Sequence, residues 1–545
     1  MPQARYFTSA TILAKPFGHD FHVVDDGDYI IFALWEHNFW NGEPGWCTAG
    51  NARAHYIAMV HPDTNTTTPG GITKLGLGSY LEPLAWVKMV GTALSPFGDP
   101  GGGFTLAHEA AHNYNGDPSF GSRWKHVNCG LPAGGDFNPA WPYVDTLRIA
   151  NDGPATGWGF DYYTREVIEP TEARDFMSYC SPKWISAYNR TGLFGVLSSP
   201  SAPVPAARPL PAALQGNDLL VVLGTIAAEP ANSLMYGYRL APEALTPKQS
   251  DMVARAYLTA PAGDPVYVLE LLDGEDKLLA SQPFTPTVAE ELGVGLGAWA
   301  EPQGSETEIL SYLVSIPYDP NAAAARITQD GLEISRLEIS ANAPTVNITS
   351  PANNATITDT LTLGWTAGDA DGDDLRFNVL YSPDNGQNWL ALATGYTSTT
   401  LVLTDTAEML AGDPAAGLIR VVASDGVHTG DDQISGLTVA NHPPQVTILN
   451  PAAGQRFSVG DSVVVAGQAL DADDGPLGPD YMQWTLDGEV VNLAEIGGGL
   501  DFVLGDLPRG PHTLKLEAVD NAGAHAEVEI VFYIGDEVYL PIIGR

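Results

Sequence analysis

Long apolar runs, positive charge and cysteine are all scarce in this sequence, and each shortage excludes a class of protein. No segment approaches the ~20 consecutive apolar residues that span a bilayer, so no transmembrane segment is expected. Only 25 lysines and arginines stand against 65 acids, giving a net charge of −40. That field repels nucleic acid and anionic membrane surfaces, so nucleic acid is excluded as a partner.

The three cysteines are too few for a disulfide scaffold and allow one bridge with one thiol left over. The N-terminus has basic residues but no apolar stretch after them, so no signal peptide is visible. An exported protein of this sequence would therefore need another route, or a leader that precedes residue 1.

The chain is long and is rich in glycine and proline. Its 545 residues are too many for one hydrophobic core, so several domains are expected. The 58 glycines and 42 prolines suit an all-β protein with many turns. The composition predicts these units: 1–197 with mixed patterns, a Pro/Ala-rich linker at 198–216, a β-sandwich at 217–341, sandwiches at 342–441 and 442–537, and a tail at 538–545.

Within the first unit, strands are expected at 54–60, 72–77 and 85–90, and either of the last two could be an edge that pairs with an extended substrate. A helix is expected to begin at Ser181 and Pro182, where serine can cap and proline can occupy the first helical position.

The last two hundred residues contain a repeat. The segment APTVNITSP at 343–351 returns as PPQVTILNP at 443–451, with its shared residues offset by 100 positions. Each copy has an acidic turn, at 369–374 and 471–475. These turns could hold structural calcium through clustered carboxylates, or could be solvated turns, since neither matches a defined calcium loop. The repeat length and its alternating strands resemble bacterial extracellular immunoglobulin-like modules.

The segment LAHEAAHNYNGDP, at 106–118, contains the candidate catalytic residues. On a helix, His108 and His112 lie one turn apart on the same face and can share one zinc ion. Glu109 lies beside them, where it can accept a proton from a zinc-activated water as general base. The pattern predicts a catalytic zinc centre, and the competing reading is a fortuitous motif in a structural β-protein.

A second motif, DFMSYC at 175–180, gives the sequence a resemblance to the metzincin metallopeptidases. In that family a methionine turn lies beneath the zinc. The resemblance implies that Met177 is the Met-turn residue and that Tyr179 approaches the metal or the developing oxyanion. The alternative is that both are ordinary core residues.

The third metal ligand departs from the family pattern, because Asn115 and Pro118 stand where metzincins have glycine and histidine. His126, in the segment WKHVNCG, is the favoured third ligand after an insertion in the turn. Asp117 is the alternative, since zinc also accepts oxygen. A gluzincin arrangement would instead use a glutamate from 166–172.

The same resemblance implies a disulfide between Cys129 and Cys180, because related secreted peptidases join the ligand loop to the Met-turn in this way. Two buried thiols, or Cys129 as a metal ligand, are the alternatives. Cys47 is expected to be an unpaired thiol. A bridge indicates an oxidising, extracellular location.

The expected fold class is therefore multidomain α+β: a metzincin-like catalytic domain followed by three all-β, immunoglobulin-like sandwiches. The expected function is a secreted zinc metalloendopeptidase acting on proteins or peptides, whose β-domains act as spacers or bind substrate or cell-surface material. The alternative is an extracellular binding or adhesion protein whose peptidase site has lost activity.

Overall fold

A computed structural model describes a little under two thirds of the chain. The described residues are 39–40, 56–60, 71–74, 84–88, 111, 127, 138–143, 149, 159–161, 166–178, 183–198, 209–226, 233–258, 266–292, 309–358, 360–404, 406, 409–492 and 501–535.

The largest sheet joins strands from distant parts of the chain. Its seven strands follow the order β1-β3-β2-β12-β13-β8-β9. β1 and β3 are parallel, and the other pairs are antiparallel. Their bounds are Tyr56–Val60 (β1), Gly71–Lys74 (β2), Leu84–Lys88 (β3), Leu219–Ile226 (β8), Leu234–Leu240 (β9), Thr287–Leu292 (β12) and Ile309–Pro317 (β13).

This sheet corrects the predicted fold class. The described residues are nearly all in strands and connections. The two α-helices whose full extent is described are Ala187–Ser198 (α4) and Pro247–Leu258 (α5). No separate α+β, metzincin-like domain is evident among them. The physical reason is strand pairing: β2 pairs with β12, so the first three strands extend a sheet built by residues on both sides of the predicted linker.

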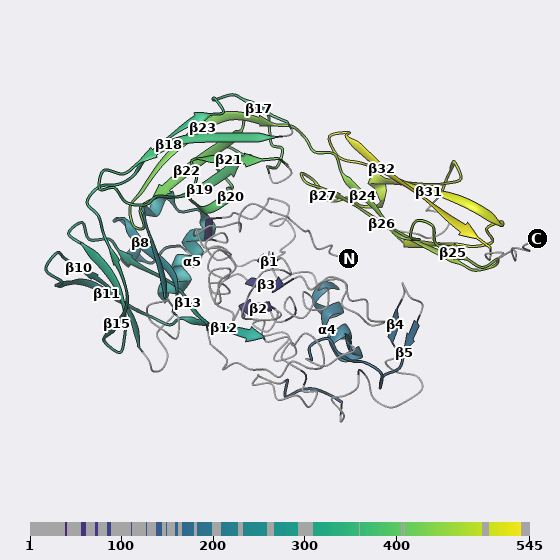
Figure 1. Cartoon of the computed structure of the whole chain (residues 1–545), viewed down its shortest axis with the longest axis horizontal. Helices are drawn as coiled ribbons and strands as arrows, with labels where there is room; N and C mark the ends of the chain where they lie inside the picture. The colour runs from purple at the N-terminus through teal and green to yellow at the C-terminus, as the bar shows by residue number, and fades with distance from the viewer. Residues whose placement is uncertain are drawn as a thin grey trace, which may run out of the picture.

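A second, four-stranded sheet faces the central strands of the first. It has the order β11-β10-β14-β15, and its apolar side chains pack with those of β8 and β13 in one buried core. Helix α5 covers the opposite face of the large sheet through Met252, Val253 and Ala256 (Figure 1). The remaining elements of this unit are β10 (Tyr267–Leu272), β11 (Leu278–Phe284), β14 (Ala324–Gln329), β15 (Leu332–Glu338), and the short 3-10 helices Ala212–Leu214 and Pro242–Ala244.

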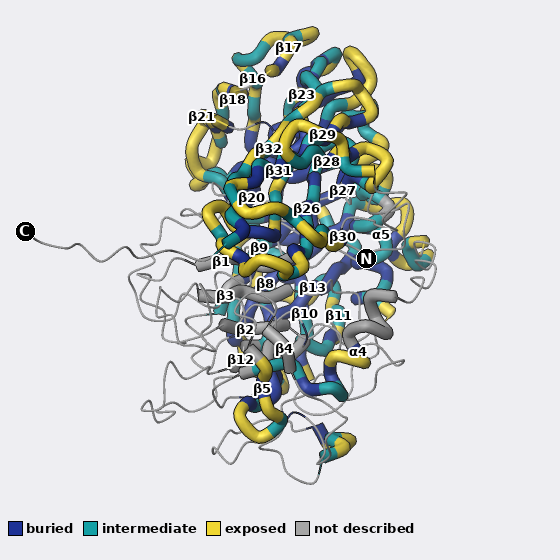
Figure 2. The backbone as a smooth tube through the Cα atoms, turned by 90° about the vertical axis from the view of Figure 1, so that its right-hand side faces the viewer, coloured by how far each residue is buried: buried dark blue, intermediate teal, exposed yellow. Residues whose placement is uncertain are grey.

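The two repeats are β-sandwiches, which confirms that part of the prediction. The first pairs a sheet β16-β18-β21 with β17-β23-β22-β19-β20, and the second pairs β24-β26-β27, extended by β30, with β25-β32-β31-β28-β29. Each pair encloses its own apolar core. Figure 2 shows the buried residues within these strands and the exposed ones mainly in their connections.

The strands of the first repeat are Thr345–Ser350 (β16), Thr356–Ile357 (β17), Leu361–Gly368 (β18), Arg376–Ser382 (β19), Leu390–Tyr396 (β20), Thr400–Leu403 (β21), Gly417–Ser424 (β22) and Thr429–Val439 (β23). Those of the second are Gln445–Asn450 (β24), Arg456–Phe457 (β25), Val463–Asp471 (β26), Gly475–Pro476 (β27), Met482–Leu486 (β28), Glu489–Val490 (β29), Asp501–Leu504 (β30), Gly510–Val519 (β31) and His525–Ile534 (β32), with a 3-10 turn at Pro479–Tyr481.

The first repeat is attached to the preceding unit by more than the chain that connects them, because backbone hydrogen bonds also join the two. The amide of Gly237 in β9 donates to the carbonyl of Gly426 at 2.9 Å, and that of Arg239 donates to the carbonyl of Val427 at 2.6 Å. A Cβ on Gly237 would lie 2.9 Å from the same Gly426 oxygen, so the approach needs glycine. Apolar residues of β19, β20 and β22 join the core under α5, which makes this junction a packed interface.

Four short strands and α4 complete the described N-terminal part. A hairpin joins Gly159–Asp161 (β4) to Glu166–Ile168 (β5), and Arg174–Asp175 (β6) pairs in parallel with Lys183–Trp184 (β7). Among the helices that the structure describes, none combines the length and the apolar character needed to cross a bilayer.

Candidate metal centre

Most of the predicted site residues lie outside the described part of the chain. They are His108, Glu109, His112, Asp117, His126, Cys129, Tyr179 and Cys180; Cys47 also lies outside it. Met177 is described, as are single residues next to two of the predicted ligands: Ala111 precedes His112, and Val127 follows His126. These neighbours define the surroundings of the predicted centre.

One small buried core brings the three described residues together. Ala111, Val127, Phe176 and Met177 form a cluster in which no member exceeds 4% exposure, with Trp141 and Ile185 packed against it. The amide of Val127 donates to the carbonyl of Met177 at 3.0 Å. The chain just before His112, the chain just after His126 and the DFMSYC turn therefore meet at one point.

The turn that holds Met177 is built around a buried carboxylate. Asp175 is 0% exposed. Its Oδ1 accepts the amide of Met177 and the side-chain amide of Asn189, both at 2.8 Å, and its Oδ2 accepts the amide of Ser186 at 2.9 Å. Burial raises the pKa of the Asp175 carboxyl, while the hydrogen bonds from Ser186, Met177 and Asn189 act against that rise. Sequence reasoning quoted Asp175 only as the start of a motif and missed this role.

Helix α4 is fixed to the same carboxylate, and it begins later than predicted. The Oγ of Ser186 accepts the amide of Asn189 at 3.1 Å, so Ser186 rather than Ser181 is the N-cap, and the helix starts at Ala187. Lys183 and Trp184, expected in the first helical turn, instead form β7 beside the strand that contains Asp175.

Aromatic side chains close the core on the side of α4. Trp141 lies edge-on to Tyr143 at 5.0 Å and to Tyr188 at 5.6 Å between ring centroids. The hydroxyl of Tyr143 accepts the amide of Tyr188 at 3.0 Å, and burial raises its pKa. This packing makes the surroundings of Met177 apolar and closed on that side.

A second group of residues could hold a metal, far from this core in sequence. Asp369, Asp373 and Asp425 each place a carboxylate oxygen within 4.8 Å of the others. Two come from the predicted acidic turn at 369–374 and the third from the turn after β22. The sequence identified the first turn as a calcium candidate but did not show that the second lies beside it.

No protein-family model matches the chain, and no curated protein matches it. Several solved structures do. Fibronectin(III)-like modules of Clostridium thermocellum CbhA match at 17% identity, covering 35% of this chain and 94% of that one, with a TM-score of 0.15. The PKD1 domain of Vibrio anguillarum Epp matches at 15% identity (18% and 98% covered, TM-score 0.13), and the Ig1-2 module of Drosophila DLAR at 14% (36% and 100%, TM-score 0.14). Scores this low carry no argument, so the β-sandwich assignment rests on the strand pairing above.

Proposed function

We propose that this chain is a secreted, zinc-dependent endopeptidase that hydrolyses peptide bonds in protein substrates. The observation that carries the proposal is the shared buried core of Ala111, Val127 and Met177. These residues neighbour, or belong to, three segments that the sequence alone assigns to one metal centre. These segments are separated by 16 and 50 residues along the chain, and a single metal centre requires that they lie close together.

His108, His112 and His126 would hold the zinc ion, with Asp117 as the alternative to His126. Imidazole nitrogens are the donors that catalytic zinc prefers, and three of them leave a position open for water or substrate. When bound, zinc supplies Lewis acidity, acidifying water and polarising the substrate carbonyl. The apolar core beneath the site fits this group, because a methionine floor excludes water from the ligands without competing as a donor.

Three further residues would transfer a proton, donate a hydrogen bond to the oxyanion, or position the site. Glu109 takes a proton from the attacking water and passes it to the leaving amine. Tyr179 can donate a hydrogen bond to the oxyanion as the carbonyl becomes tetrahedral. Asp175 acts only through Met177 and α4, so it is a positioning residue.

The resemblance to metzincin peptidases, which is limited to the motifs at 106–118 and 175–180, supports the same roles. It also suggests the disulfide between Cys129 and Cys180, which would tie the ligand loop to the turn that follows Met177. The hydrogen bond between Val127 and Met177 supports this pairing, because it brings the two segments together two and three residues before these cysteines.

A second candidate function is a binding or adhesion protein with an inactive peptidase site. It is favoured by Asn115 and Pro118, which replace the family's glycine and third histidine. In that case the two sandwich repeats would provide the surfaces that bind the partner.

Hydrolysis of an unfolded, fluorescently labelled protein by the full chain separates the two functions. We expect Glu109→Gln to lower kcat/KM by about 10²–10⁴-fold, and a chelator to abolish activity in the wild type. Glu275→Gln is the matched control, since Glu275 is exposed in the turn between β10 and β11 and is not one of the predicted ligands or their alternatives. Equal rates in the wild type and Glu109→Gln, or activity that survives the chelator, would refute the enzyme. A wild type that binds zinc but cleaves nothing would favour the adhesion protein.

A further inference from the structure

The junction between the two repeats is built differently from the junction before it. The first repeat shares an apolar core with the preceding unit, whereas the cores of the two repeats are separate clusters within the described residues. Domains usually move relative to one another unless their interface is large and apolar. The orientation of the second repeat therefore depends on the polar contacts around residues 440–444, which connect β23 to β24.

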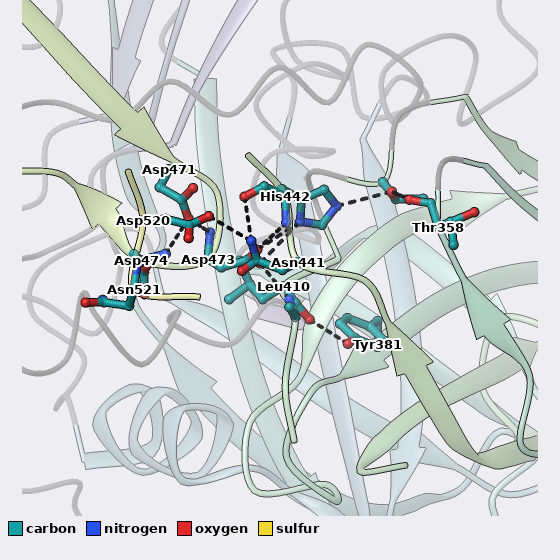
Figure 3. Close-up of polar contacts among 12 residues, drawn as sticks. Thr358, Tyr381, Leu410, Asn441, His442, Asp471, Asp473, Asp474, Asp520 and Asn521 are labelled. Carbon is teal, nitrogen blue, oxygen red and sulfur yellow. Dashed lines mark hydrogen bonds and ion pairs between the residues drawn. The ribbon is translucent and has the colours of Figure 1, made fainter. Parts of the chain in front are cut away.

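Asp473, in the acidic turn between β26 and β27, lies at the centre of these contacts (Figure 3). Its side chain is 8% exposed. Its Oδ1 accepts the amide of Ala411, in the first repeat, at 2.6 Å, and its Oδ2 accepts the amide of His442, in the connection, at 2.8 Å. The neighbouring Asn441 donates its side-chain amide to Asp520 of the second repeat at 2.7 Å. One carboxylate thus receives donors from the first repeat and from the connecting segment.

His442 contacts both repeats through the two nitrogens of its ring. Its Nδ1 lies 3.2 Å from the Oδ2 of Asp473, and its Nε2 lies 3.2 Å from the hydroxyl of Thr406 in the first repeat. Thr406 is buried, and its hydroxyl donates to the carbonyl of Thr358 at 3.1 Å. The ring is therefore held between a fixed group of each repeat.

The other donor to Asp473, the amide of Ala411, is positioned by the core of the first repeat. The carbonyl of Leu410, one residue earlier, accepts the hydroxyl of the buried Tyr381 at 2.6 Å. Burial acts to raise the pKa of Asp473, but hydrogen bonds from His442 and Ala411 outweigh it and hold that pKa below its usual value. An ionised carboxylate is a stronger acceptor than a neutral group, so these contacts favour one fixed geometry.

The first repeat uses the same arrangement on its own connecting segment. Asp371 takes the place of Asp473, since each stands two residues after an aspartate whose Oδ1 accepts two amides of the turn. The oxygens of Asp371 accept the backbone amide and the side-chain amide of Asn342, both at 2.7 Å, and Asn342 precedes His442 by the repeat offset of 100 positions. Asp371 is exposed, and the junction before the first repeat is held by the shared core and by β9. The second repeat extends the arrangement to a donor of its neighbour.

We propose that Asp473 locks the hinge between the two repeats, so that they move as one rigid body. In the locked state Ala411 and His442 both donate to its carboxylate. Loss of these bonds turns residues 440–444 into a flexible joint, about which the second repeat can swing. The acidic turn at 471–475 then holds the connecting segment directly, which is a different use of its carboxylates from calcium binding. This role is independent of the proposed peptidase activity.

Energy transfer between fluorophores on the two repeats of the full chain measures this motion. Labels at Thr397 and Glu489, which are exposed residues of the first and second repeat, are introduced as unnatural amino acids so that the native cysteines stay unchanged. Asp473→Asn is the main variant, because it keeps the shape of the side chain but loses the charge and one of the two acceptor oxygens. Asp371→Asn is the matched control, since it weakens the equivalent bonds to Asn342 and leaves the second junction intact.

We expect a narrow distance distribution in the wild type and in Asp371→Asn, and a distribution about twofold wider or more in Asp473→Asn. Thr406→Val removes the hydroxyl beside His442 from the other side of the hinge and should widen the distribution to a smaller extent. Hydrogen exchange in β26 and β31 should stay as slow as in the wild type, which shows that the second repeat remains folded. If Asp473→Asn unfolds that repeat, Thr406→Val decides the question.

An equally narrow distribution in the wild type, Asp473→Asn and Thr406→Val would overturn the proposal, as would a wild-type distribution that is already wide. A chelator provides a further check on the full chain. If it widens the wild-type distribution, a metal ion and not the direct hydrogen bonds holds the junction, and the proposal fails. None of these measurements uses peptide hydrolysis, so this proposal and the peptidase proposal can fail separately.

Discussion

Asp175 joins the turn of Met177 to helix α4. Its two oxygens accept hydrogen bonds from the backbone of Met177, the backbone of Ser186 and the side chain of Asn189, and it is completely buried. A carboxylate that accepts several buried donors keeps them satisfied, and removal of that acceptor leaves each donor without a partner. Asp175 therefore holds the turn that contains Met177 against helix α4.

Replacement of Asp175 by alanine should destabilise this region. We expect Asp175→Ala to lower the free energy of local opening by about 2–4 kcal/mol, because three buried N–H groups lose their acceptor. Amide hydrogen exchange of peptides covering 174–192 measures this opening directly. Asp413→Ala, an exposed aspartate with no such role, should change the same peptides by less than about 0.5 kcal/mol. Equal exchange in both variants would show that Asp175 is not needed.

At this scale the sequence indicated Met177 but not Asp175. A methionine in a recognisable motif is a local signal, and the structure buries it beside Ala111 and Val127. The role of Asp175 depends on donors 11 and 14 residues further along the chain. Spacing alone does not predict such contacts. The predicted roles of His108, Glu109, His112 and His126 stay predictions, since these residues lie outside the described part.

Helix α5 shows how an element is specified by its first turn. The hydroxyl of Thr246 accepts the amide of Gln249 at 3.2 Å, and the Oε1 of Gln249 accepts the amide of Thr246 at 2.9 Å. This reciprocal pair is a capping box, and Pro247 occupies the first helical position. The segment TPKQ carried this signal in the sequence, but the helix was not predicted because the surrounding residues are so rich in strands.

Removal of the cap should weaken α5 by a predictable amount. We expect Thr246→Ala to lower the free energy of opening of residues 247–258 by about 1 kcal/mol. Thr246→Ser keeps the hydroxyl and should retain most of that stability. Hydrogen exchange of this helix in the three chains provides the comparison. An alanine variant that exchanges like the wild type would mean that packing of Met252 and Val253, rather than the cap, determines the helix.

Strands were predicted better than helix ends. The expected strands at 54–60, 72–77 and 85–90 correspond closely to β1, β2 and β3. The sequence repeat predicted β16 and β24, which occupy equivalent positions in the two repeats. Period-two alternation and a fixed offset are local signals. The start of α4 was wrong because Lys183 and Trp184 pair with β6, a tertiary contact that overrides a plausible cap at Ser181.

At the scale of the whole molecule, neighbouring parts of the chain share sheets and cores. β2 pairs with β12, more than two hundred residues later, and β9 bonds to the loop after β22. Composition divided the chain at the Pro/Ala-rich segment 198–216, but it does not show which strands pair across such a segment. The predicted α+β domain is wrong for this reason: three of its described strands, β1, β2 and β3, extend the sheet of the following unit.

The three sandwiches and the N-terminal part suggest a division of roles in the proposed enzyme. The histidine helix, the ligand loop and the Met177 turn would carry the chemistry, and the β-domains would hold that part at a set distance from whatever they bind. These roles depend on whether a zinc centre forms from His108, His112 and His126.

Zinc K-edge X-ray absorption of the full chain, loaded with one equivalent of zinc, tests this centre most directly. We expect three imidazole nitrogens at about 2.0–2.1 Å together with a lighter oxygen shell. His126→Ala should remove one imidazole from the spectrum, and Asp117→Ala should leave it unchanged. A shell made mainly of oxygens, or an imidazole count unaffected by His126→Ala, would contradict the proposed centre.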